Sequence, residues 1–147
     1  MEEQNQRLIT ALNRAVIQYR GIYSAWSKKH NLSYNEMLVL YTIRDERFCT
    51  QKQICDSYLL PRQTMNYVFL KMRKEGLLVM DAAHSAGREK AFTLTEKGRA
   101  YAEPFLSSLN HVEARAEELM GRKKIEAMTA LLREFDEALD KALKEND

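Results

Sequence analysis

The chain has 147 residues, of which 45% are apolar and 30% charged, and its net charge is +2 at pH 7. This length fits one domain and this composition is ordinary for a soluble globular protein, so long irregular regions are not expected. The longest apolar run, Met37–Tyr41, is far below the roughly 20 residues of a membrane span, and the acidic N-terminus is unlike a signal peptide. Two cysteines, Cys49 and Cys55, are too few for a disulfide framework, so we expect a cytoplasmic protein.

The N-terminal segment predicts one long helix that fades near His30. Its apolar residues recur at spacings of three and four, which places them on one face of a helix. They are Leu8, Leu12, Ala15, Val16, Tyr19, Ile22, Tyr23 and Trp26. Ser33 and Glu36 then have the spacing of a capping box, in which both side chains satisfy otherwise unpaired backbone amides. The run Met37–Ile43 is apolar nearly all round, so the second helix should be central.

A short helix, a turn and another helix follow. Thr50 and Gln53 form a second capping box, which predicts a helix through about Ser57. Tyr58–Leu60 is expected to be a turn, and Pro61 suits the first position of the next helix, where its missing amide costs nothing. That helix has an inward apolar stripe of Met65, Val68, Phe69 and Met72. Its opposite face carries Arg62, Gln63, Asn66, Tyr67, Lys71 and Arg73.

After Gly76, the residue type expected just past a helix end, the period of the sequence changes. Leu77–Met80 and Lys90–Leu94 have the character of strands, and His84–Gly87 has the composition of a tight turn between them. We therefore predict a single β-hairpin at this position.

The remainder of the chain is helical. Thr95 can cap a long helix, Pro104 predicts a bend or break about ten residues into it, and Gly121 interrupts the pattern again. The last helix has a narrow apolar seam, which is typical of helix pairing. The seam consists of Ile125, Met128, Leu132, Phe135, Leu139 and Leu143.

This order of elements predicts a mainly α-helical fold with a small β-hairpin wing. Residues 33–95 have the parts of a winged helix-turn-helix, in which a second helix enters the major groove of DNA. The sequence further resembles the MarR family of transcriptional regulators over nearly its whole length. The segments that carry the resemblance are Ser33–Leu40, Thr50–Cys55, Thr64–Val68, Lys74–Leu78, and Arg88 with Phe92–Gly98.

The resemblance implies a single MarR-like domain over residues 1–147. Residues 33–95 would form the DNA-binding lobe, and residues 1–30 and 96–147 a helical dimerisation region. By geometry, groove contacts are expected from Arg62, Gln63, Asn66 and Tyr67. Lys52 and Thr64 are candidates for phosphate contacts, and Arg88 for a minor-groove contact by the wing. The segment from Thr50 to Lys90 agrees, with seven basic and four acidic residues.

Two departures from the family pattern affect these expectations. Ala86–Gly87 occupies the place where the family's wing carries an Asp-Arg pair, so Arg88 lacks its usual nearby carboxylate. Tyr67 stands where a basic residue is common, which implies a different operator preference. Lys71, Arg73 and Lys74 are interpreted as a solvated helix face, with contacts to DNA as the alternative.

The cysteines, the histidines and four aromatic residues are further candidates for redox, metal-binding or ligand-binding sites. Cys55 occupies a small, usually buried slot of the helix-turn-helix, so we expect structural cysteines and no redox switch. The three histidines have no metal ligands at suitable spacing, so neither a metal nor another cofactor is predicted. Aromatic side chains at helical spacing are either core or the lining of a pocket for a small aromatic effector. They are Tyr19, Tyr23, Trp26 and Tyr41.

The sequence thus predicts a homodimeric repressor that binds a pseudo-palindromic operator and is released by a small molecule. The competing interpretation is a helical protein-interaction adaptor that has kept a winged fold without binding DNA. No nucleophile with a base, phosphate loop or carboxylate pair was found, so an enzyme is not expected.

Overall fold

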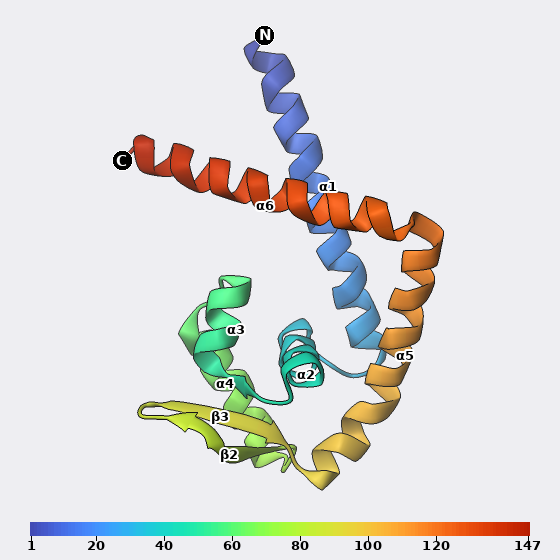
Figure 1. Cartoon of the computed structure of the whole chain (residues 1–147), viewed down its shortest axis with the longest axis vertical. Coiled ribbons are helices and arrows are strands. Elements are labelled where there is room, and N and C mark those ends of the chain that lie inside the picture. The colour runs from blue at the N-terminus through green and yellow to red at the C-terminus, as the bar shows by residue number, and fades with distance from the viewer. The chain divides into compact units, whose positions relative to one another are not determined.

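The computed structural model describes all 147 residues and contains six helices and a three-stranded antiparallel sheet (Figure 1). The helices are α1 (Glu2–Lys29), α2 (Tyr34–Glu46), α3 (Gln51–Tyr58), α4 (Arg62–Lys74), α5 (Glu96–Met120) and α6 (Arg122–Glu145). The strands are β1 (Cys49–Thr50), β2 (Leu78–Ala86) and β3 (Glu89–Leu94). Met1–Leu106 and Ser107–Asp147 form two compact units. The predicted fold class, helical with a small wing, is confirmed.

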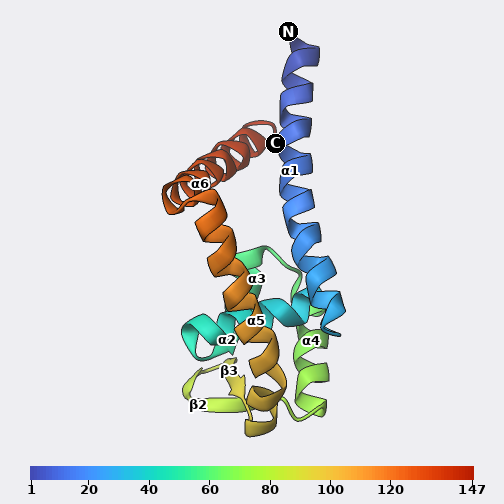
Figure 2. The same cartoon turned by 90° about the vertical axis from the view of Figure 1, so that its right-hand side faces the viewer.

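The core of the first unit is built around α2, as its all-round apolar sequence predicts. α2 contacts α1, α3, α4 and β1 (Figures 1 and 2). Val39 and Leu40 are completely buried, and the four residues of the predicted inward stripe of α4 are buried as well. The Phe69 ring meets Phe92 of β3 edge to face at 5.4 Å between centroids. This apolar packing fixes which face of α4 is left for solvent.

The sheet has the order β1-β3-β2, so the predicted hairpin is present with one added strand. In β1, Cys49 pairs with Phe92 and Thr50 with Ala91. β2 continues six residues beyond the predicted Met80, because an irregularity between Asp81 and Ala86 accommodates extra residues opposite β3. Side chains hold this irregularity together.

The helix ends follow the sequence signals with two corrections. Thr50 and Gln53 form a complete capping box, as predicted. Ser33 accepts a hydrogen bond from the Glu36 amide, but the Glu36 carboxylate does not return to the cap. It accepts a bond from Lys71 Nζ at 2.5 Å instead, because α4 brings a cation to this buried carboxylate. Pro61 is the residue before α4 and not its first residue.

Of the bend or break predicted at Pro104, a break does not occur, since Pro104 lies inside the continuous helix α5. A proline removes one backbone hydrogen bond, and the turns on either side suffice to keep the helix. The start of α5 is as predicted, with the Gly98 amide donating to the Thr95 hydroxyl at 2.9 Å. No helix of the chain is long and apolar enough to cross a membrane.

Candidate nucleic-acid interface

The outer face of α4 is a polar surface open to solvent. Arg62, Gln63 and Asn66 are exposed, Thr64 is half-buried, and the ring of Tyr67 is 70% exposed. The structure therefore brings five of the seven predicted DNA-contacting residues onto one helix face.

The start of α4 has no side-chain cap. α3 and α4 are joined by a tight turn in which Leu59 adopts the left-handed conformation, with φ of 50°. The residue before α4 is Pro61, which provides no side-chain cap for the first amides of the helix. Unpaired amides and the positive end of the helix dipole favour an anion at such a terminus.

The wing ends beside this helix in a two-residue connection, Gly87–Arg88 (Figure 1). Gly87 has a φ of 55°, which a glycine adopts without strain. Lys90 Nζ donates to the Gly87 carbonyl at 2.9 Å, so the tip is closed by a side chain. Arg88 at the tip is exposed, as a residue that reaches into a groove must be.

Three of the predicted contact residues already have partners within the chain. Arg62 Nη2 donates to Glu89 Oε1 at 2.7 Å, and Lys52 Nζ donates to Asp56 Oδ2 at 2.5 Å. These carboxylates raise the pKa of both Arg62 and Lys52, so both cations stay charged. The amide of Gln51 donates to Asn66 Oδ1 at 3.2 Å. The sequence analysis missed these partners, since spacing along the chain carries no signal for them.

Two of the cations weighed as a solvated face are engaged in packing. Lys71 pairs with the buried carboxylate of Glu36, which raises the pKa of Lys71. The Arg73 guanidinium lies over the Phe92 ring at 5.1 Å. Lys71 and Arg73 therefore stabilise the lobe.

The four aromatic residues predicted for an effector pocket lie on α1 and α2, which contact each other. Tyr19 and Tyr23 meet edge to face at 5.3 Å. Trp26 packs against Phe105 at 4.7 Å, and Tyr41 stacks with the guanidinium of Arg44 at 4.0 Å.

A different cluster forms around Tyr34, which the sequence analysis did not single out. The Arg20 guanidinium lies over the Tyr34 ring at 4.9 Å. Burial raises the pKa of Tyr34, and Arg20 partly offsets this effect. Tyr19 and Tyr58 are close enough to act on the same hydroxyl electrostatically. Arg20 is thus stacked on Tyr34, and two further phenols lie within electrostatic range of the Tyr34 hydroxyl.

Of the two cysteines, Cys49 is buried, whereas Cys55, which was expected in a buried slot, is only half-buried because Ile54 is the residue of α3 that enters the core. Cys49 is completely buried, and burial raises the pKa of its thiol to about 12. Burial also raises the pKa of Cys55, although Arg62 opposes the effect. Neither thiol is therefore a ready thiolate near neutral pH.

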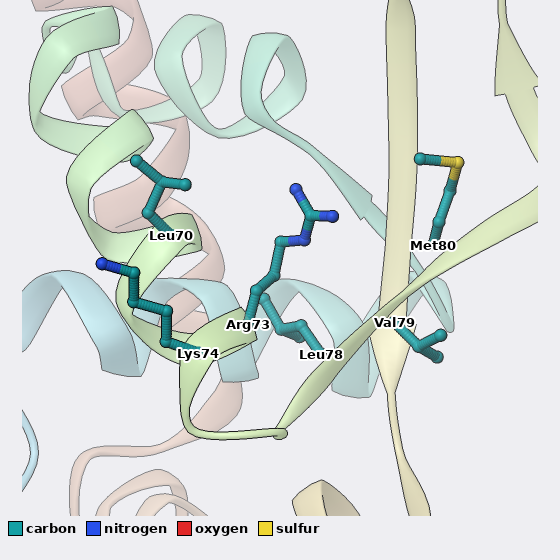
Figure 3. Close-up of a pocket in the computed structure, with 6 residues that line it drawn as sticks. All are labelled: Leu70, Arg73, Lys74, Leu78, Val79 and Met80. Atoms are coloured by element: carbon teal, nitrogen blue, oxygen red, sulfur yellow. The ribbon is translucent and has the colours of Figure 1, made fainter.

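A shallow hollow of about 530 Å³ lies between the last turns of α4 and the beginning of β2 (Figure 3). In Figure 3, Leu70 and Arg73 project from α4 toward the strand, which bears Met80 and Val79 on opposite sides. None of the predicted site residues lines it. The lining consists of Leu70, Arg73, Lys74, Leu78, Val79 and Met80.

Comparison with known proteins agrees with this geometry. Residues 32–98 match the winged helix DNA-binding domain family, and these residues contain α2 to β3 and the surface just described. The fold and the match define the class: this part of the chain is a winged helix domain similar to the winged helix DNA-binding domain family. No curated protein sequence matches the chain significantly.

Solved structures extend the match to the rest of the chain. A MarR family regulator from Neisseria meningitidis has 29% sequence identity, with a TM-score of 0.83 over 98% of this chain and 99% of its own. Bordetella bronchiseptica BpsR, whose DNA binding is regulated by 6-hydroxynicotinic acid, has 21% identity and a TM-score of 0.65 over 88% and 98%. Staphylococcus aureus MepR, solved as a DNA complex, has 16% identity and a TM-score of 0.62 over 88% and 96%. The predicted resemblance is confirmed: the chain is a winged helix protein with the fold of the MarR family regulators.

Proposed function

We propose that the chain is a sequence-specific regulator that places α4 in the major groove of double-stranded DNA and the wing tip in the neighbouring minor groove. The observation that carries this proposal is the exposed polar face of α4, from Arg62 to Tyr67, with Arg88 beside it on the wing. Arg and Asn side chains on a groove-facing helix recognise guanine and adenine edges through paired hydrogen bonds. The Staphylococcus aureus relative in complex with DNA supports this class of partner.

The working unit of this proposal is a homodimer. α6 has no buried residue, although it carries large apolar side chains such as Leu131, which is 65% exposed, and Leu143, which is 59% exposed. α1 exposes Ile17 and Ile22 to 69% and 71%. Apolar surface of this extent on two long helices favours cover by a second copy. Twofold symmetry then requires a pseudo-palindromic operator with half-sites about 10 bp apart.

Regulation by a small aromatic acid fits the cluster around Tyr34. The Arg20 cation would neutralise a carboxylate, and the rings of Tyr19, Tyr34 and Tyr58 would contact an aromatic ring. The Bordetella bronchiseptica relative responds to an acid of this type. Such a ligand would release a cytoplasmic repressor from its operator only if it binds the arrangement of the repressor that fits DNA less tightly than it binds a second arrangement that does not.

The decisive experiment is selection of bound duplexes from a random library, followed by titration of the selected operator. We expect a palindromic motif, which would establish the partner, the symmetry and the half-site spacing together. Arg62→Gln and Asn66→Ala should each relax the preference at one base position. A chain that ignores both the library and a non-specific duplex at low salt would be the adaptor of the alternative interpretation.

A further inference from the structure

The Arg62–Glu89 pair joins the two parts of the proposed DNA surface. Arg62 is the first residue of α4, and Glu89 is the first residue of β3, directly after the wing tip. The Arg62 side chain is 63% exposed and that of Glu89 is 30% exposed. The pair therefore lies at the surface, where a DNA duplex would meet the helix and the wing together.

The chemistry of the guanidinium leaves it free to bind while it is paired. An arginine has five N–H donors in a rigid plane, and Glu89 accepts from one of its terminal nitrogens, Nη2. The remaining donors can still form the two parallel hydrogen bonds that read N7 and O6 of guanine. A guanidinium held on one side by a carboxylate is oriented for that contact before DNA arrives.

The same carboxylate disfavours an alternative use of Arg62. Contacts with phosphate carry no sequence information. A phosphate that approaches Arg62 also approaches Glu89, and the two negative charges repel. The pair therefore weakens attachment to arbitrary DNA more than it weakens a contact directed at a base edge.

We propose that Glu89 is a positioning residue that sets sequence specificity by holding Arg62 for a guanine and away from the phosphates. This role rests on the proposed function, because it requires that α4 reads DNA. The neighbouring pair, Lys52 with Asp56, provides a matched comparison. A lysine ammonium is a point charge without a plane to orient, so Asp56 offsets the charge of Lys52 but does not orient it.

The test compares Glu89→Gln with Asp56→Asn in the full-length dimer. Each substitution removes one negative charge from the surface at nearly constant size. For Glu89→Gln we expect tighter binding to a non-specific duplex, with a salt slope of log K steeper by about 0.9, since Arg62 gains one phosphate. We also expect the preference for guanine at one position of each half-site to decline by about tenfold. Asp56→Asn should tighten binding while leaving that preference unchanged.

A second comparison tests whether Glu89 affects base preference through Arg62 or through the charge of the surface in general. In the Arg62→Gln background, Glu89→Gln should no longer alter base preference, because Glu89 acts through Arg62. Equal base preferences in the Glu89→Gln protein and the wild type would overturn the proposal, as would the same loss of preference in Asp56→Asn. A wild-type protein that binds no duplex would instead refute the proposed function, and the role of Glu89 would fall with it.

Discussion

Gly98 provides the sharpest test of how the wing is attached to the long helix that follows it. A Cβ atom built on Gly98 would lie 2.1 Å from the carbonyl oxygen of Leu77 and 3.0 Å from its carbonyl carbon. Both atoms belong to the backbone of Leu77, so rotation of a side chain cannot relieve the clash. Gly98→Ala must therefore push the first turn of α5 away from the beginning of the wing.

The expected cost follows from the contacts at this junction. The Thr95 amide donates to the Leu77 carbonyl at 3.0 Å, and the Thr95 hydroxyl donates to the Gly76 carbonyl at 2.6 Å. Losing two hydrogen bonds removes about 2 kcal/mol of stability, and overpacking adds about 1–3 kcal/mol. Alanine recovers up to about 1 kcal/mol of helix propensity. The net expectation is a loss of about 2–4 kcal/mol.

Thermal unfolding at a fixed protein concentration measures this loss. A domain of this size changes its Tm by about 2–4 °C per kcal/mol, so Gly98→Ala should unfold about 4–16 °C lower. Gly21→Ala is the matched control, because its Cβ would meet nothing within 4 Å in helix α1. That variant should be stabilised by up to about 1 kcal/mol. A Gly98→Ala protein that unfolds at or above the wild-type temperature would refute this account of the junction.

Three further expectations concern charges and thiols. Lys71→Met should lower the free energy of unfolding, measured by chemical denaturation at neutral pH, by about 1–2 kcal/mol, because it leaves the buried Glu36 carboxylate unpaired. Glu36→Gln removes that carboxylate and should cost less, so an equal loss in the two variants would contradict this explanation. Since pairing raises the pKa of Lys71, its stabilising contribution is complete below the ordinary pKa of 10.5 and is lost as pH rises through the elevated value, so the wild type should approach Lys71→Met in strongly alkaline solution. If the wing enters the minor groove, Arg88→Ala should weaken operator binding by about 5- to 150-fold with a shallower salt slope, and unchanged titrations would remove the wing from the interface. Iodoacetamide at pH 8 should leave Cys49 unlabelled in the native protein and label it after denaturation, as followed by mass spectrometry, and rapid native labelling would contradict its burial.

Local sequence patterns predicted the helices and the wing because each depends on residues close together in the chain. Thr50 with Gln53 set the start of α3, and the apolar stripe of α4 determined which face it buries. β1 was not predicted because a strand of two residues is too short to show an alternation of apolar and polar side chains. The Glu36 carboxylate was misassigned because its true partner, Lys71, lies 35 residues away.

The candidate site was predictable in outline for the same reason. Helical periodicity located the exposed residues of α4, whereas Arg88 at the hairpin tip was assigned from the family resemblance. The partners of those residues were not predictable, since Arg62 and Glu89 are 27 residues apart and Gln51 and Asn66 are 15 apart. Only the fold brings such pairs together.

This internal pairing bears on how a chain with a net charge of only +2 could select an operator. A surface of free cations attracts every duplex alike, because phosphate contacts dominate affinity and are independent of sequence. Here Lys52 and Arg62 each have a carboxylate within hydrogen-bonding distance, so much of the non-specific attraction is cancelled before DNA arrives. Base edges that satisfy the remaining donors of Arg62 then account for a larger share of the binding free energy. Discrimination between DNA sequences would then come from two effects: the pairs weaken the attraction to phosphates that all sequences share, and Arg62 strengthens one contact with a base edge.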